Sequence, residues 1–114
     1  MPEFKRPPRD PDIEAEITVK LTSEGGRKSP MFTGYRPNHD FGVEGMLNDA
    51  MHEYPEKGSI SPGEKGKANI WFLAPEYQIG RLFIGMEFTV QEGARLVGTG
   101  IITRVVNESL QKSI

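Results

Sequence analysis

The chain has 114 residues, no cysteine and a net charge of −2 at neutral pH. This length suits one domain with a single core, and the lack of cysteine excludes disulfides, thiolate chemistry and thiol-containing zinc sites. A net negative charge argues against a protein that coats nucleic acid, which would be basic overall.

We expect the protein to be located in the cytoplasm, which is a reducing compartment. The sequence contains no apolar run near the roughly 20 residues needed to span a bilayer, and its first residues lack the hydrophobic region of a signal peptide. We therefore expect no membrane partner.

The N-terminal residues 1–11 carry four prolines and little to bury, and they predict a mobile arm. A strand is predicted next, over residues 12–21, because apolar and polar side chains alternate with a period of two. Its expected inner face consists of Ile13, Ala15, Ile17, Val19 and Leu21.

The middle of the chain gives weaker signals. A turn on Gly25-Gly26 is followed by a second predicted strand that begins with Met31 and Phe32. Residues 41–62 allow either a short helix around residues 46–54 or short strand pieces joined by irregular loop, and we favour the strand pieces. A further strand is predicted over residues 67–74, ending before Pro75.

A closing hairpin is predicted over residues 85–106. Its first run alternates through Phe88 and Val90, and its turn contains Gly93, which can adopt the positive φ of a tight hairpin. In the return run, Val97, Thr99, Ile101, Thr103 and Val105 share one face, and β-branched residues of this kind fit a pleated, half-buried surface. Gly98 and Gly100 would lie opposite and mark a bend, a bulge or a close approach of backbone. A polar tail is expected over residues 107–114, which leaves residues 12–106 as one all-β antiparallel domain, a barrel or a sandwich.

No catalytic or metal-binding pattern emerges. The Gly25-Gly26-Arg27-Lys28 run lacks the glycine directly before lysine that a phosphate-binding loop requires. His39 and His52 have spacings to nearby acids that match no metal site, and no G-x-S-x-G marks a nucleophile. We expect no enzyme activity, no metal and no cofactor.

Two predicted turns share one pattern. Residues 23–27 and 91–95 both read x-Glu-Gly-small-Arg, and each follows a predicted strand. If the turns share one rim, Arg27, Lys28 and Arg95 could form a patch that binds a phosphate or a carboxylate. The alternative, which the spacing alone favours, is that both turns are solvated hairpin tips.

Two longer segments contain these turns, SEGGRKSPMFTGYRPNHDF and GMEFTVQEGARLVGTGIITRVV. In sequence and in spacing they resemble the two hallmark segments of the third, C-terminal domain of bacterial elongation factor Tu. The resemblance extends over residues 12–106. It implies a six-stranded antiparallel β-barrel without the GTPase domain and second barrel that precede it in the full factor.

The resemblance also implies a binding surface. Carried over by position, the residues that face the T-stem of aminoacyl-tRNA are Arg27, Lys28, Asn38, Glu92 and Gly93, with Arg95 beside them. Lys28 and Asn38 stand where histidine and glutamine are common in that family, and Ala94 replaces the second glycine of the later turn.

Three functions are open on these grounds. A protein-interaction module, binding a protein that normally recognises elongation factor Tu, suits the acidic balance. A weak tRNA- or RNA-binding module would use the rim of Arg27 and Arg95, and no DNA binding is expected. The third is a module that works only within a larger complex.

Overall fold

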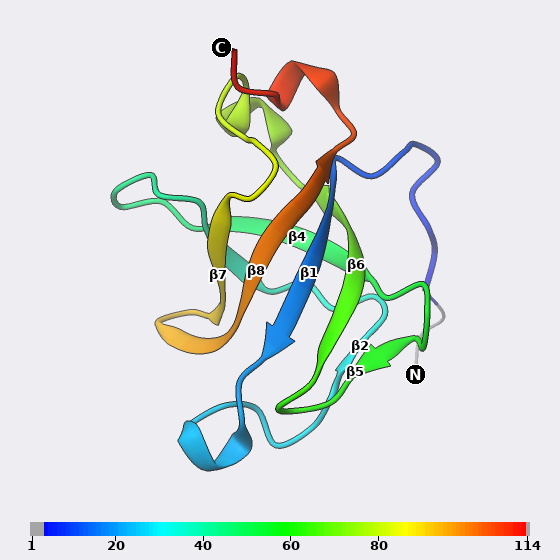
Figure 1. Cartoon of the computed structure of the whole chain (residues 1–114), viewed down its shortest axis with the longest axis vertical. Coiled ribbons are helices and arrows are strands. Elements are labelled where there is room, and N and C mark those ends of the chain that lie inside the picture. The colour runs from blue at the N-terminus through cyan, green and yellow to red at the C-terminus, as the bar shows by residue number, and fades with distance from the viewer. Residues whose placement is uncertain (1–3, 114) are drawn as a thin grey trace.

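Six strands close into a barrel in the order β1-β6-β4-β3-β7-β8, and every neighbouring pair is antiparallel (Figure 1). The computed structural model describes residues 4–113. The barrel strands are β1 (Ile13–Val19), β3 (Asn38–Asp40), β4 (Asn48–Glu53), β6 (Lys65–Phe72), β7 (Glu87–Glu92) and β8 (Arg95–Val105). The six-stranded antiparallel barrel is thereby confirmed.

Short elements complete the chain. Strands β2 (Met31–Phe32) and β5 (Ser59–Ile60) pair as a separate two-stranded sheet. Three single turns of 3₁₀ helix follow β1, β6 and β8, namely η1 (Thr22–Glu24), η2 (Pro75–Gln78) and η3 (Glu108–Leu110). Within the described range there is no α-helix.

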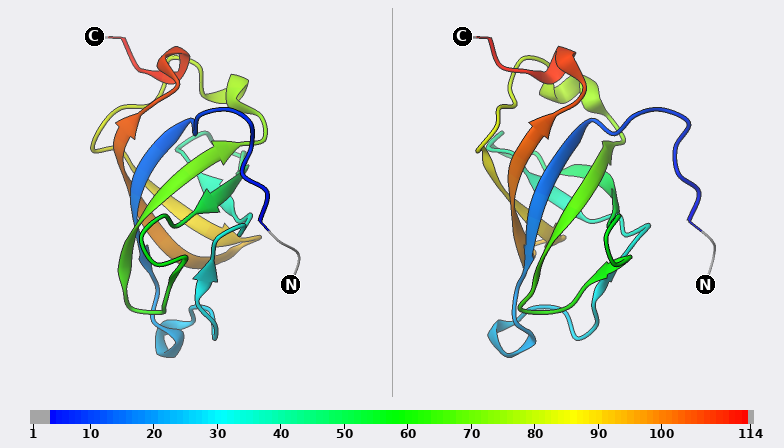
Figure 2. Two further views of the ribbon diagram at one scale, coloured as in Figure 1. Left: turned by 90° about the vertical axis from the view of Figure 1, so that its right-hand side faces the viewer. Right: turned by 45° about the vertical axis from the view of Figure 1, so that its right-hand side comes forward.

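Strand β1 lies between β6 and β8, where it closes the barrel (Figure 2). Four of its predicted core residues, Ile13, Ala15, Ile17 and Val19, are buried. Leu21 was predicted to join them, but that prediction is wrong, because the strand ends at Val19 and Leu21 is 45% exposed. The Leu21 side chain lies over Gly63 instead, so closely that a Cβ on Gly63 would stand 2.7 Å from its Cδ2.

The middle of the chain forms strand and not helix. β4 pairs with both β3 and β6, which confirms the strand pieces favoured from sequence. Ala50, His52 and Tyr54 alternate along β4 and just beyond it, and all three are buried. The alternation was hard to see in the sequence because the central inward residue is a histidine.

The predicted face of β8 is divided. Val97 is buried and Val105 packs against the core, but Thr99, Ile101 and Thr103 are exposed, and Gly98, Gly100 and Ile102 are buried instead. The β7–β8 register shifts between Val90 and Gln91, and such a bulge changes which side chains point inward. Gly100 faces the core because the ring of Phe88 fills the place of a side chain there: a Cβ on Gly100 would stand 2.2 Å from Phe88 Cζ. The expected close approach of backbone is confirmed at Gly98, where a Cβ would stand 2.8 Å from the carbonyl oxygen of Thr18; at Gly100 a side chain approaches instead.

Gly100→Ala is expected to destabilise the barrel by about 2 kcal/mol, because the buried Phe88 ring packs on Phe41 and cannot move aside freely. Urea unfolding measures the loss, and Thr99→Ala on the outer face of the same strand is the control. Phe88→Leu should lower the free energy of unfolding by less in the Gly100→Ala variant than in the wild-type chain. Equal costs in the two backgrounds would show that the two residues do not compete for one space.

The predicted arm and the predicted tail both pack against the barrel. Leu110, in the predicted polar tail, is buried in the core, and its carbonyl accepts a hydrogen bond from the backbone N–H of Leu82 at 2.8 Å. In the predicted arm, the carbonyl of Arg9 accepts from Trp71 Nε1 at 2.9 Å, and Arg6 forms an ion pair with Glu53. The polar pattern missed these contacts because a single leucine and two arginines form them. Residues 1–3 and 114, which belong to the predicted arm and tail, lie outside the described residues.

Candidate functional site

The two turns that share the x-Glu-Gly-small-Arg pattern meet at one end of the barrel (Figure 1). The first turn follows β1 through η1, and Gly25 adopts φ 94° at its end. Gly26 folds back against the strand so closely that a Cβ would stand 2.4 Å from the carbonyl oxygen of Lys20. Only glycine fits there, and this tight fold brings residues 25–27 to the β7–β8 turn.

Glu92 is the acceptor at the centre of this meeting point. Its Oε2 accepts hydrogen bonds from Arg27 Nη1 and, at 2.5 Å, from the Tyr35 hydroxyl. The Arg27 guanidinium also stacks on the Tyr35 ring at 4.6 Å from its centroid. Its remaining N–H groups donate to Ser29 and Pro30, and the Arg27 side chain is only 19% exposed.

Arg95 ties the second turn to the first. Its Nε donates to the carbonyl of Gly25 at 3.1 Å and its Nη2 to that of Gly26 at 2.5 Å. Its Nη1 lies 3.9 Å from Glu92 Oε1, and half of the side chain is exposed. We call Arg27, Tyr35, Glu92 and Arg95 the rim latch.

The charges of the rim latch are fixed at neutral pH. The hydrogen bond from Tyr35 lowers the pKa of Glu92; burial opposes this shift, and the hydrogen bond and charge of Arg27 add to it. Burial alone would lower the pKa of Arg27, but its contacts with Glu92 and Tyr35 raise it overall. Burial and the hydrogen bond to Glu92 raise the pKa of Tyr35. Arginine, carboxylate and phenol therefore stand as an ion pair with a neutral donor.

The other predicted site residues lie on both sides of the latch. Asn38 donates from Nδ2 to Asp49, and its Oδ1 accepts from the backbone N–H of Gly93 at 2.9 Å. Lys28 is exposed and is part of no ion pair or side-chain hydrogen bond found within residues 4–113. The structure thus brings together Arg27, Asn38, Glu92, Gly93 and Arg95 and leaves Lys28 apart. The two turns do share one rim, which is the condition for the anion-binding patch, but Arg27 is directed at protein atoms and not at solvent.

A buried pair of histidines was missed from the sequence. Nε2 of His39 and Nε2 of His52 lie 2.7 Å apart inside the barrel. His39 Nδ1 lies 2.9 Å from the carbonyl oxygen of Asn48, and His52 Nδ1 lies 2.8 Å from the Tyr54 hydroxyl. These histidines were considered only together with nearby acids, and their contact with each other was not predicted from the sequence. The inward period of β4 was the signal that could have revealed them.

No three or more histidine, cysteine, aspartate or glutamate side chains within residues 4–113 are placed to hold a metal ion. In the same part of the chain, no helix is long and apolar enough to cross a membrane.

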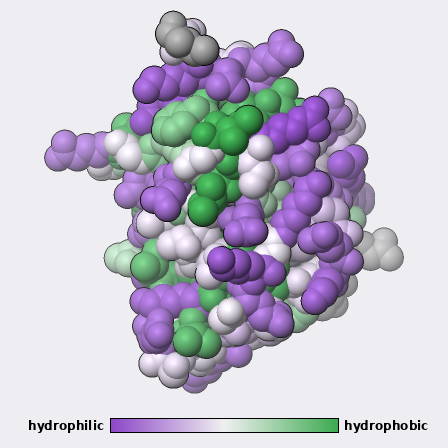
Figure 3. Space-filling model, viewed as in Figure 1, coloured by the Kyte–Doolittle hydropathy of each residue, from purple (hydrophilic) through white to green (hydrophobic). Residues whose placement is uncertain are grey.

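An exposed apolar surface lies at the opposite end of the barrel from the rim latch. Ten large apolar side chains are exposed within residues 4–113, and five of them belong to the connection between β6 and β7, namely Leu73, Tyr77, Ile79, Phe83 and Ile84. We call this connection, residues 73–84, the apolar end. Figure 3 shows apolar atoms gathered on the front face toward this end of the barrel.

Hydrogen bonds of Gln78 and Arg81 fix the apolar end to the barrel. Gln78 is fully buried and donates to Asn48 Oδ1 at 2.7 Å. Arg81 donates to Gln78 Oε1 at 2.6 Å and to the carbonyl of Phe41 at 3.2 Å. The exposed apolar side chains therefore stand on an ordered base and not on a free loop.

No model of a known protein family matches this chain.

Proposed function

We propose that this chain is a non-enzymatic protein-interaction module that resembles the third domain of elongation factor Tu and acts in translation or its regulation. The apolar end carries this proposal. Five large apolar side chains on an ordered base are typical of a surface that another protein covers. The resemblance, which extends over residues 12–106, supports the link to translation.

The rim latch argues against RNA binding as the main function. Arg27 is mostly buried and bonded to Glu92, and Arg95 donates to two backbone carbonyls. Lys28 and the exposed half of Arg95 would neutralise one or two phosphates, which gives weak binding with a small salt dependence. The proposed partner is a protein that normally recognises elongation factor Tu; tRNA is the alternative.

Affinity capture from cell extract, with and without ribonuclease, tests the proposal. A protein should be retained after ribonuclease treatment by the wild-type chain, and Tyr77→Ser/Ile79→Ser should lose it. Both side chains are exposed, so the variant should fold normally, which its amide spectrum checks.

Lys28→Ala is the matched rim variant, because it changes the charge of the rim without removing a contact of the latch. It should leave the captured protein unchanged. Arg27→Ala would be a poorer choice, since it would also loosen the two turns. Capture of tRNA that disappears with ribonuclease and with Lys28→Ala would replace the proposal by the RNA-binding alternative.

A further inference from the structure

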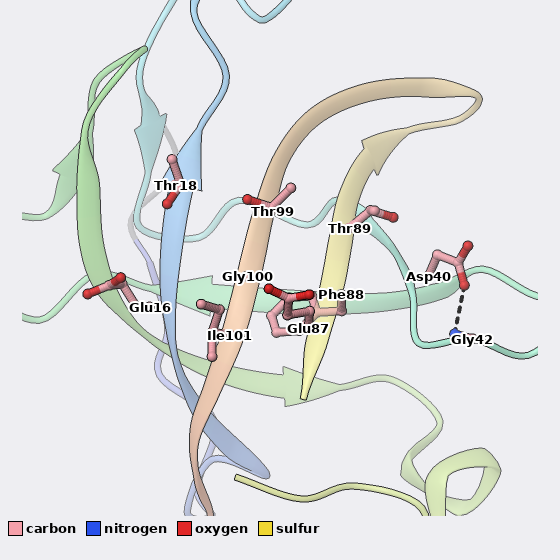
Figure 4. Close-up of a pocket in the computed structure, with 10 residues that line it drawn as sticks. All are labelled: Glu16, Thr18, Asp40, Gly42, Glu87, Phe88, Thr89, Thr99, Gly100 and Ile101. Atoms are coloured by element: carbon pink, nitrogen blue, oxygen red, sulfur yellow. Dashed lines mark hydrogen bonds between the residues drawn. The ribbon is translucent and has the colours of Figure 1, made fainter. Parts of the chain in front are cut away.

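The outer face of the barrel is hollowed by a groove of about 420 Å³ over β1, β8, β7 and β3 (Figure 4). This face lies between the rim latch and the apolar end, and neither of those surfaces includes its residues. The side chains that line it come in two rows that run across the strands. We call it the acidic groove.

Strand pairing sets the two rows. Ile101 is the register partner of both Glu16 and Glu87, so one row reads Glu16, Ile101, Glu87. Thr99 is the partner of both Thr18 and Thr89, and Thr89 pairs onward with Asp40, so the second row reads Thr18, Thr99, Thr89, Asp40. Gly100 lies between the rows at a position that faces the core, so the outer face there consists of backbone.

The carboxylates of this groove have no cationic partner within residues 4–113. No lysine or arginine lines the groove, and Glu16, Glu87 and Asp40 take part in none of the ion pairs. Lys67 stands opposite Glu16 in the β1–β6 register but bonds Glu14 at 3.3 Å. Asp40 accepts only from the backbone N–H of Gly42, at 2.7 Å.

We propose that the acidic groove binds lysine or arginine side chains from an extended, basic segment of a partner protein. Ile101 is 41% exposed between Glu16 and Glu87, so an aliphatic stem can lie on it while the cation reaches a carboxylate on one side or the other. The threonine methyl groups extend the same apolar floor. A cation there gains charge-assisted hydrogen bonds to these carboxylates.

The groove suits an extended segment. A volume of about 420 Å³ holds a few side chains. In an extended segment alternate side chains point the same way, which matches entry of successive basic residues. Three carboxylates repel phosphate, so the groove does not suit RNA. The inference rests on the proposed function in taking the occupant to be a protein.

Amide NMR of the isotopically labelled full chain tests this, with a hexapeptide of alternating lysine and valine as the probe. Shifts that saturate with peptide should centre on the amides of Glu16, Glu87 and Ile101. Glu16→Gln/Glu87→Gln should weaken binding by roughly fivefold, the effect expected for two exposed charge contacts. A hexapeptide of alternating glutamate and valine should give no shifts.

Glu56→Gln/Glu108→Gln is the matched control, because both residues are exposed, both lie outside the groove and the apolar end, and the net charge changes equally. It should bind as the wild-type chain does. Equal weakening in both double variants would show attraction to overall charge and overturn the proposal, as would an absence of shifts in the wild-type chain. If the peptide gives no shifts but ribonuclease-resistant capture is retained, the groove proposal fails and the proposed function stands. If the peptide binds as expected but no protein is captured after ribonuclease treatment, the groove proposal stands and the proposed function fails.

Discussion

Replacing Asp12 by alanine is expected to lower the free energy of unfolding by about 3 kcal/mol. The Asp12 side chain is fully buried where β1 begins. Its Oδ2 accepts from the backbone N–H of Phe72 at 2.7 Å, and its Oδ1 accepts from Asn107 Nδ2 at 2.9 Å. One carboxylate therefore joins the start of β1 to the end of β6 and to the chain that follows β8.

The cost arises mainly from the partners that alanine would leave behind. The N–H of Phe72 is buried, and a buried donor without an acceptor costs about 1–3 kcal/mol. Arg9 also donates to Asp12, at 2.9 Å from Nη1 to Oδ1, but its side chain is 45% exposed. Water can solvate that guanidinium after the substitution, so the ion pair contributes little to the loss.

Urea unfolding measures this effect, and Asp10→Ala is the matched control. Asp10 is an exposed acid in the same segment, and its removal should change stability by less than about 0.5 kcal/mol. Asp12→Asn should lie between the two, because the amide keeps one acceptor oxygen but turns two N–H groups toward donors. A loss for Asp12→Ala no larger than that for Asp10→Ala would show that the carboxylate does not join the three segments.

Asp12 also shows why the sequence predicts some features and not others. The alternation from Ile13 to Val19 is local and predicts β1 correctly. The partners of Asp12 lie 60 and 95 residues further along the chain, and no local pattern connects them. Only closure of the barrel brings them to one carboxylate.

The residues of the rim latch were predicted only in part, because the sequence shows the two turns but not the contacts between them. The repeated x-Glu-Gly-small-Arg pattern marks two turns of the same kind, and its two glutamates and arginines are visible in the sequence. That Arg95 would donate to Gly25 and Gly26, about 70 positions away, depends on the barrel register. The pattern therefore identified Arg27 and Arg95. It did not predict that their N–H groups would donate to other atoms of the protein. On β8 the prediction is right for Val97 but wrong for Thr99 and Ile101, because the bulge beside Val97 shifts the period of two for the residues that follow.

The buried histidine pair predicts a loss of stability in mild acid. The carbonyl of Asn48 can only accept, so His39 carries its proton on Nδ1 and accepts at Nε2. His52 then donates from Nε2 to His39, and its Nδ1 accepts from the Tyr54 hydroxyl. With both imidazoles neutral, each ring nitrogen and the Tyr54 hydroxyl has a hydrogen-bond partner; with both protonated, two N–H donors would face each other at 2.7 Å.

Burial lowers the pKa of His39 to about 4, although the hydrogen bond to Asn48 and the charge of Asp49 oppose the shift. Burial, with a smaller contribution from His39, also lowers the pKa of His52. In the unfolded chain both histidines titrate near 6.5. As the pH falls below 6.5 the unfolded state therefore binds protons that the folded state does not, so the stability present above that pH is lost progressively toward pH 4.

The free energy of unfolding should fall by about 4 kcal/mol between pH 7 and pH 5, since each histidine contributes up to about 1.4 kcal/mol per pH unit. Carboxylates contribute little in this window, because their unfolded pKa values lie near 4. Urea unfolding at several pH values measures the slope. His52→Gln, whose amide can still donate to His39 and accept from Tyr54, should halve it.

Imidazole NMR tests the same arrangement without a variant, because the chain has only two histidines. Nitrogen shifts should show His39 protonated at Nδ1 and His52 at Nε2, and neither ring should titrate between pH 7 and pH 5. A stability that stays flat over this range, or an imidazole that titrates near pH 6.5 in the folded protein, would contradict a neutral, mutually bonded pair. Because the effect requires both rings to be closed off from water, it also reports directly on whether the six strands close.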